Sequence, residues 1–375
     1  MMGVGKAAPR DETRLSRVVV SNALKKRRRR PRLRGIKGNG DQDMANEVIV
    51  RPQLPVPSPR RSVPALVFGT RPTTIAKRGT FYVVALVVLY FGVIGNLMHR
   101  IDTDLDFVPV NAVEGGSHAV NMAAGLIKRE TVTHRWIAND PAFYPTAFLD
   151  NTPNFQRGLM RAVSRFTIEL EDQVGRLRGS SAIDPDLERA AGLLQFPTDV
   201  WFFNFEEGFL PVQPADHQYR VAMRALEAYN ARVAAGQAVF ETRADALAAI
   251  VQRIASELGA RAALTDAHLR RDNFVLDFVA DDIFYFNKGV AYGNYLLIRE
   301  LGRDFAALIE AQGLTSIWVQ TLDSLRSAAL LRPAVVLNGG GDTSVLANHL
   351  HMQGFYIKRA ILQLDEVAQV IRVQR

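Results

Sequence analysis

The sequence predicts an all-α protein with a single N-terminal transmembrane helix followed by a multi-helix exported bundle. Three observations predict it: an uncharged apolar run at residues 79–98, a strongly basic segment before it, and helical periodicity through most of the chain after it. A helix rises about 1.5 Å per residue, so a run of this length spans the roughly 30 Å hydrocarbon core of a bilayer. We therefore predict a disordered basic cytoplasmic tail (1–78), a transmembrane helix (79–98) and a helical periplasmic domain (99–375).

The tail is predicted to be disordered because it is highly charged, contains few aromatic residues and is interrupted by four prolines between residues 55 and 64. Its densest basic cluster is Lys25–Arg34. Such a cluster near a membrane attracts anionic lipid headgroups, and it also serves as a plain topology signal. No aromatic residue is interleaved with these charges, which argues against binding of single-stranded nucleic acid.

The charge distribution predicts the orientation of the apolar run. Residues 1–78 hold 19 Lys and Arg against 5 Asp and Glu, a formal charge of +14, whereas the whole chain carries +8, so residues 79–375 carry −6. By the positive-inside rule the N-terminus stays in the cytoplasm and the C-terminal domain is exported, with the lipid bilayer as the first partner. Two other interpretations of the run are a cleaved signal peptide and a buried core helix.

The exported domain is predicted to be helical because apolar residues recur at steps of three and four in five segments. These segments are 155–177, 247–258, 298–308, 318–329 and 346–371. Ser117, Asp184 and Asp342 stand where helix N-caps are expected. Three short β-prone runs, at 200–205, 274–278 and 334–337, are alternative strand candidates.

A loop rich in Pro, Asn, Asp and aromatic residues separates two of these helices at residues 136–159. A long ordered loop often carries function. In the plainer interpretation, its aromatic residues plug the end of the bundle; these are Phe143, Tyr144, Phe148 and Phe155.

Four blocks of sequence resemble a known family. They are LIKRETVTHRWIANDPAFYPTAFLDNTPNFQRGL (Leu126–Leu159), FETRADAL (Phe240–Leu247), DDIFYFNKGVAYG (Asp281–Gly293) and LNGGGDTSVLANHL (Leu337–Leu350). Over roughly residues 80–372 the chain is similar to an uncharacterised proteobacterial membrane-anchored family, domain of unknown function 2333. The resemblance implies a single-pass protein of the bacterial inner membrane with a helical periplasmic domain. It implies no activity, cofactor or catalytic residue. The long basic leader and the segment Gly179–Leu187 depart from the family pattern.

Common catalytic and metal-binding motifs do not occur in the sequence. There is no cysteine and no GxSxG motif, so the usual nucleophile signals are missing. The alternating carboxylates of Asp102, Asp104 and Asp106 lack the glycine and the final glutamate of a calcium loop, and the GGG sequence at 339–341 does not fit a phosphate-binding loop. The sequence therefore predicts no catalytic residue, no metal ligand and no cofactor. It weighs against an enzyme without deciding the question.

The candidate site is a polar patch assembled from four separate blocks. Its members are Asp150, Asn151, Arg243, Asp281, Asp282, Asn338 and Asp342. Asp and Asn favour helix caps and turns, so each could simply end a helix. If the helix ends meet, Arg243 could pair with one of the carboxylates. We expect a polar patch at one end of the bundle, which is either a structural clamp or a partner-binding surface.

Two functional interpretations remain open. In the first, the protein is a membrane-anchored cell-envelope protein that binds another envelope component. In the second, it is an envelope enzyme or small-ligand receptor with a cleft between helices. A broad exposed apolar surface favours the first, and a pocket in which Asp150, Asn151, Arg243 and Asn287 converge favours the second.

Overall fold

The computed structural model describes residues 72–177, 184–203, 208, 210–270, 278–333, 336 and 348–373. Helices are the regular secondary structure of these residues, which form no strand, and this confirms the all-α class. The elements are α1 (Pro72–Val87), η1 (Val88–Ile94), α2 (Gly95–Met98), α3 (His118–Lys128), η2 (Arg129–Thr133), α4 (Asn151–Leu177), α5 (Pro185–Leu193), α6 (Ala215–Ala234), α7 (Ala244–Leu269), α8 (Phe278–Asp304), α9 (Ala306–Ala311), α10 (Thr315–Leu330) and α11 (His349–Val373). Both η1 and η2 are π-helical.

The described residues form no strand. Within the β-prone run at 200–205, Phe203 forms an isolated antiparallel bridge with Pro211, which is not a strand. Most of the other two runs, together with the tail up to residue 71 and its cluster Lys25–Arg34, lies outside the described residues. An apolar run without a hydrogen-bonding partner strand stays a loop, because single strands are not stable alone.

One helix of the described chain is long and apolar enough to cross a membrane. It covers Ala76–Met98, with a mean hydropathy of 2.2 and only 6% of its apolar window buried. This exposure argues against a buried core helix. The helix that contains this span begins at Pro72, before the apolar run. Proline suits the first position of a helix, because the N–H that it lacks would have no partner within the helix there.

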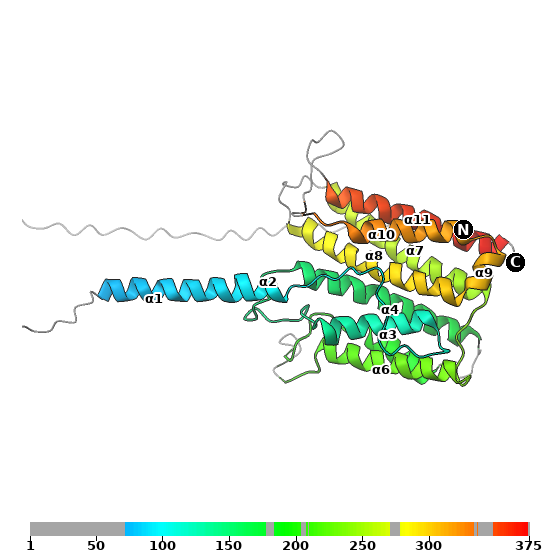
Figure 1. The fold of residues 1–375 in the computed structure, drawn as a ribbon, viewed down its shortest axis with the longest axis horizontal. Helices are drawn as coiled ribbons and strands as arrows, with labels where there is room; N and C mark the ends of the chain where they lie inside the picture. Colours follow the sequence, from blue (N-terminus) through cyan, green and yellow to red (C-terminus); the bar gives the residue numbers. More distant parts are fainter. Residues whose placement is uncertain are drawn as a thin grey trace, which may run out of the picture. The chain divides into compact units, whose positions relative to one another are not determined.

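The centre of the domain is a close pair of parallel helices, α4 and α8 (Figure 1). The two backbones touch at glycines. A Cβ at Gly158 would lie 2.0 Å from the carbonyl oxygen of Phe286, and one at Gly289 would lie 2.1 Å from that of Phe155. Only glycine permits this approach, which lets Asn154 and the first turn of α8 meet across the helix ends.

The remaining helices cover the two sides of this pair. In Figure 1, α7, α10 and α11 lie on one side of the pair and α3 and α6 lie on the other; α7 packs mainly against α4 and α11, α10 against α8 and α11, α3 mainly against α8 and α6. The buried face of α4 includes Phe155, Leu159 and Phe166, all close to fully buried. Each such side chain contributes about 1.5–3 kcal/mol through removal from water, so the α4 stripe expected from the sequence is a main source of stability.

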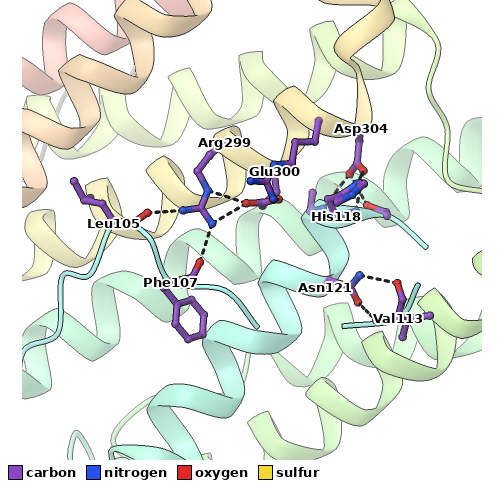
Figure 2. A network of polar contacts seen from close by, with 11 residues as sticks. Leu105, Phe107, Val113, His118, Asn121, Arg299, Glu300 and Asp304 are labelled. Carbon is purple, nitrogen blue, oxygen red and sulfur yellow. Dashed lines mark hydrogen bonds and ion pairs between the residues drawn. The ribbon is translucent and has the colours of Figure 1, made fainter. Parts of the chain in front are cut away.

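The segment between the candidate membrane helix and α3 is fastened to the end of α8 (Figure 2). Arg299 donates to the carbonyl oxygens of Leu105 and, at 2.8 Å, of Phe107. The N-cap predicted at Ser117 is confirmed, since its hydroxyl accepts from the N–H of Val120 at 3.2 Å. The cap predicted at Asp184 is also confirmed, because its carboxylate accepts from the first turn of α5. The cap expected at Asp342 lies outside the described residues.

Candidate functional site

Four of the predicted site residues meet where α4 and α8 begin. Asn154 donates to Asp282 Oδ1 at 2.7 Å. With its amide oriented so that both of its atoms are satisfied, Asn151 donates to Asp281 Oδ2 at 2.5 Å and to Asp150 Oδ1 at 3.3 Å. Because α4 and α8 are parallel, their first turns lie side by side, and both bring carboxylates to the same place.

This acidic cluster favours protonated carboxyls. Burial, and then the charges of Asp150 and Asp282, raise the pKa of Asp281 to about 6. The pKa of Asp282 is also raised, first by burial and then by the charge of Asp150 and a hydrogen bond with it, although Asn154 and Arg157 oppose the shift. Two carboxyl groups that hydrogen-bond to each other share a proton, so the cluster holds fewer negative charges than it has carboxyls.

Arg243 is not part of this cluster, and its expected pairing with Asp150, Asp281 or Asp282 is wrong. Its guanidinium pairs instead with Asp245 at 2.8 Å, and both side chains are exposed. Arg243 precedes α7, which runs antiparallel to α4: Arg253 pairs with Glu169, whereas Glu257 pairs with Arg161 nearer the start of α4. The start of α7 therefore lies beside the end of α4, away from Asp150.

The other two predicted members of the patch, Asn338 and Asp342, lie outside the described residues. The patch as expected from the sequence is thus reduced to Asp150, Asn151, Asp281 and Asp282 in the described part of the chain.

Beside the acidic cluster, the loop at 134–150 is held in place by buried polar contacts. Asp140 accepts from Arg135 at 2.8 Å and from the hydroxyl of Thr146 at 2.5 Å. Trp136 and Asn139 donate to the carbonyl oxygens of Thr198 and Val200. These contacts order the loop even though it has no regular secondary structure.

The ordered loop exposes aromatic side chains instead of burying them. Phe155 is in the core as expected, but Phe143 is 61% and Phe148 is 72% exposed, so for these two the end-plug interpretation is wrong. Phe143 and Tyr144 stack edge-on with Trp201, which in turn contacts Phe202. We call this surface the aromatic face; it consists of Phe143, Tyr144, Phe148, Trp201 and Phe202.

The aromatic face contacts the end of the candidate membrane helix. The hydroxyl of Tyr90 donates to the carbonyl oxygen of Phe143 at 3.2 Å, and the rings of Phe91 and Phe148 lie 4.6 Å apart. Gly95 is buried against the carbonyl oxygen of Pro145, where a Cβ would come within 2.2 Å. The last turns of the candidate membrane helix therefore pack against the loop at 134–150.

Two cavities among the described residues bear on the choice between a ligand cleft and a binding surface. One, of about 390 Å³, adjoins the aromatic face, and its charged groups are paired with each other, Arg135 with Asp140 and Arg220 with Asp216. The other, of about 410 Å³, lies against α4. Neither is lined by Asp150, Asn151, Arg243 or Asn287, the residues whose convergence would favour a ligand cleft. In the described chain, no group of three or more acidic or histidine side chains could hold a metal ion.

Sequence reasoning missed a buried ionic network at η2. Arg129 and Glu130 are 4% and 0% exposed, and Arg129 Nε donates to Glu130 Oε1 at 2.9 Å. The guanidinium also donates to the hydroxyl of Tyr292 at 2.6 Å and lies over the rings of Phe107 and Tyr292. The available signal was a run of three charged residues, Lys128, Arg129 and Glu130, directly after the apolar residues 122–127 of α3.

The described fold is thus that of a helical bundle domain that follows one candidate membrane helix. Residues 108–275 match the family model described as an uncharacterized protein conserved in bacteria, domain of unknown function 2333. This match confirms the resemblance to that uncharacterised family for the blocks at 126–159 and 240–247, while the blocks at 281–293 and 337–350 lie beyond the matched range. Neither a search of curated proteins nor a search of solved structures found a match to the chain.

Proposed function

We propose that this protein is a single-pass protein of the bacterial inner membrane whose periplasmic domain binds another envelope component through the aromatic face. The observation that carries the proposal is the contact between the end of the apolar helix and this face, made by Tyr90 with Phe143 and by Phe91 with Phe148. A face joined to the end of a membrane helix lies at the membrane surface.

The chemistry of the face suits that position. Aromatic rings are enriched at membrane–water interfaces, where an apolar ring and a polar edge are both accommodated. Three rings of this face, Phe143, Phe148 and Phe202, are exposed, and exposed apolar side chains that gather on one part of a protein mark an interaction surface more often than isolated ones do. The partner that fits is therefore a protein or lipid component that itself lies at the outer surface of the inner membrane.

The orientation follows from charge. The excess of basic residues before the helix, and the acidic residues Asp102, Asp104 and Asp106 after it, favour a cytoplasmic N-terminus. In that orientation Lys25–Arg34 faces the anionic inner leaflet, where each basic residue near the surface contributes about 1 kcal/mol of attraction.

A phosphatase reporter that is active only after export tests the topology. Fused behind Arg375, it should be active; the same reporter fused behind Arg71, before the helix, should be inactive. An inactive but stably expressed fusion at the C-terminus contradicts the proposed orientation.

A photo-crosslinking amino acid tests the binding surface. Placed at Phe148, which is 72% exposed, it should give discrete adducts in intact cells. The matched control is Leu362 on α11, which is 70% exposed and lies outside the aromatic face. Equal adducts at the two positions, or none at Phe148, contradict a role for the aromatic face.

A further inference from the structure

The larger cavity lies between α4 and the segment at 194–199. Its volume of about 410 Å³ is in the range of small-molecule sites, roughly 300–1,000 Å³. One wall carries Arg157, Arg161 and Arg165, which are spaced by four residues and so project from one face of α4. Apolar and aromatic side chains complete the wall, among them Met160, Ile168, Leu194, Phe196 and Tyr219.

The arginines outnumber the carboxylates around this cavity. Glu257, which is 8% exposed, accepts two hydrogen bonds from Arg161 at 3.0 and 3.1 Å. The same carboxylate lies 3.3 Å from Arg165 Nε and 3.6 Å from Arg261 Nε. With Arg157 included, four guanidinium groups of the described chain line or back the cavity, whereas the carboxyls beside them are those of Glu257, the exposed Asp199 and Asp282, whose charge interacts with Arg157. The cavity therefore has an excess of positive charge.

Some N–H donors of these guanidinium groups have no hydrogen-bond acceptor in the described chain. Among the described residues, Arg165 Nε lies 3.3 Å from the carboxylate of Glu257 but is buried without a hydrogen-bond partner, so the guanidinium of Arg165 can still donate to another acceptor. Arg157 is positioned by its bonds to the carbonyl oxygen of Ala138 at 2.8 Å and to Asn154 Oδ1 at 3.4 Å, and its buried Nε has no hydrogen-bond partner in the described chain. Buried unsatisfied donors of this kind are costly and call for an acceptor.

The crowding of positive charge also acts on Arg261 behind the wall. Burial lowers the pKa of its guanidinium, Glu257 raises it, and the charges of Arg161 and Arg165 lower it again. One carboxylate does not compensate three guanidinium groups, and a bound anion relieves their mutual repulsion.

We propose that this cavity binds a small organic anion, whose phosphate or carboxylate oxygens accept hydrogen bonds from Arg165 and are attracted by the positive charge of Arg157. The planar fork of arginine suits both oxygen groups, and the apolar wall around Met160 and Phe196 takes the carbon body of the ligand. This site is separate from the aromatic face and goes beyond the proposed function, so either proposal can fail without the other.

Calorimetry on the detergent-solubilised full-length protein tests the site with three probes: inorganic phosphate, citrate and short-chain dihexanoyl phosphatidic acid. At least one probe should bind saturably, and more weakly as salt is added. Arg165→Gln should weaken that binding about tenfold or more. It should leave the fold intact, because Arg161 still holds Glu257 through two hydrogen bonds.

The control is Arg253→Gln. Arg253 also pairs with a buried carboxylate, Glu169 at 2.8 Å, and is 41% exposed against 33% for Arg165, but it does not line the cavity. A second variant works in the opposite direction: Asp199→Asn removes an exposed negative charge from the facing wall and should tighten binding severalfold without a change in core packing.

Each outcome decides the proposal. Binding of phosphatidic acid alone identifies a lipid headgroup as the ligand class, whereas binding of phosphate or citrate identifies a free small anion; both support the site. Absence of saturable binding of all three probes at millimolar concentration overturns it. So does binding that Arg165→Gln and Arg253→Gln weaken equally, or that Asp199→Asn leaves unchanged.

Discussion

The carboxylate of Asp304 accepts a hydrogen bond from the backbone N–H of His118 at 2.8 Å, although the two residues lie at the ends of different helices. The same carboxylate lies 2.8 Å from His118 Nδ1 and accepts from the N–H of Ala119 and the hydroxyl of Ser117. Asp304 ends α8 and thus caps α3 (Figure 2). A negative charge at a helix N-terminus also interacts favourably with the helix dipole.

Loss of this cap should destabilise the domain. Asp304→Ala removes a carboxylate that is only 5% exposed and leaves several donors of α3 without an acceptor, so we expect a loss of about 2–4 kcal/mol in the free energy of unfolding. Urea unfolding of the full-length protein in detergent measures it. The control Asp266→Ala removes an exposed ion pair with Lys358 and should cost at most about 1 kcal/mol. Equal losses of unfolding free energy in the two variants would show that the Asp304 cap contributes no more than an exposed ion pair does.

The contact between α4 and α8 should not tolerate a methyl group. Gly158→Ala would place a Cβ 2.0 Å from a backbone oxygen, so the helices must move apart, at a cost of about 3 kcal/mol or more. Gly259→Ala is the matched control, since Gly259 is inside α7 and has no atom within 4 Å of the added Cβ. There the greater helix propensity of alanine should stabilise by about 0.5–1 kcal/mol. Thermal unfolding of both variants measures the difference, and a stable Gly158→Ala variant would contradict the close packing.

The helices were predictable because their apolar stripes are local signals. The apolar stripe from Phe155 to Leu177 predicts α4. Ser117 and Asp184 were predictable as N-caps because a cap depends on residues that are close in the sequence. The glycines at 158 and 289 gave no such signal, because the reason for each is a backbone carbonyl on another helix.

The candidate site was predictable only in part for the same reason. Asp150 and Asp281 were expected to meet, and they do, since both stand where a helix begins. Arg243 also stands where a helix begins, but that helix is antiparallel to α4, and sequence alone does not give the direction of packing. The charge of the cavity between α4 and the segment at 194–199 depends on how many of its arginines Glu257 neutralises. Glu257 belongs to α7, which is distant in sequence from α4, so the excess of positive charge could not be predicted from the sequence.

The acidic cluster should make stability depend on pH. The pKa of Asp281 is raised to about 6 from an ordinary 3.8, so the folded state binds this proton more tightly than the unfolded chain does. The contribution of Asp281 to stability is therefore greatest below about pH 4 and is lost as the pH rises towards about 6.

Asp281→Asn imitates the protonated carboxyl and should remove this dependence. Because the side chain is only half-buried and solvent screens the repulsion, we expect a gain of about 1 kcal/mol at pH 7 that disappears near pH 4. Urea unfolding at a series of pH values measures it. A variant less stable than the wild-type protein at pH 7 would mean that the ionised carboxylate is itself needed in the cluster.

The buried pair at η2 should be far more sensitive to the loss of one partner than to the loss of both. Arg129→Met leaves the carboxylate of Glu130 buried without its guanidinium, and breaking such a pair costs about 3–5 kcal/mol. Burial opposes the charge of Arg129, but Glu130 and Tyr292 raise its pKa, so the guanidinium stays charged at neutral pH.

Adding Glu130→Gln to Arg129→Met should restore much of this loss. The neutral amide removes the uncompensated charge, and its carbonyl oxygen still accepts from Gln156 Nε2, which lies 3.2 Å from Glu130 Oε2 in the wild-type protein. A double-mutant cycle from urea unfolding measures the coupling, which we expect to reach about 2 kcal/mol. If the two single losses simply add, the ion pair does not account for the stability of this segment, and the stacking of Arg129 on Phe107 and Tyr292 becomes the dominant contribution.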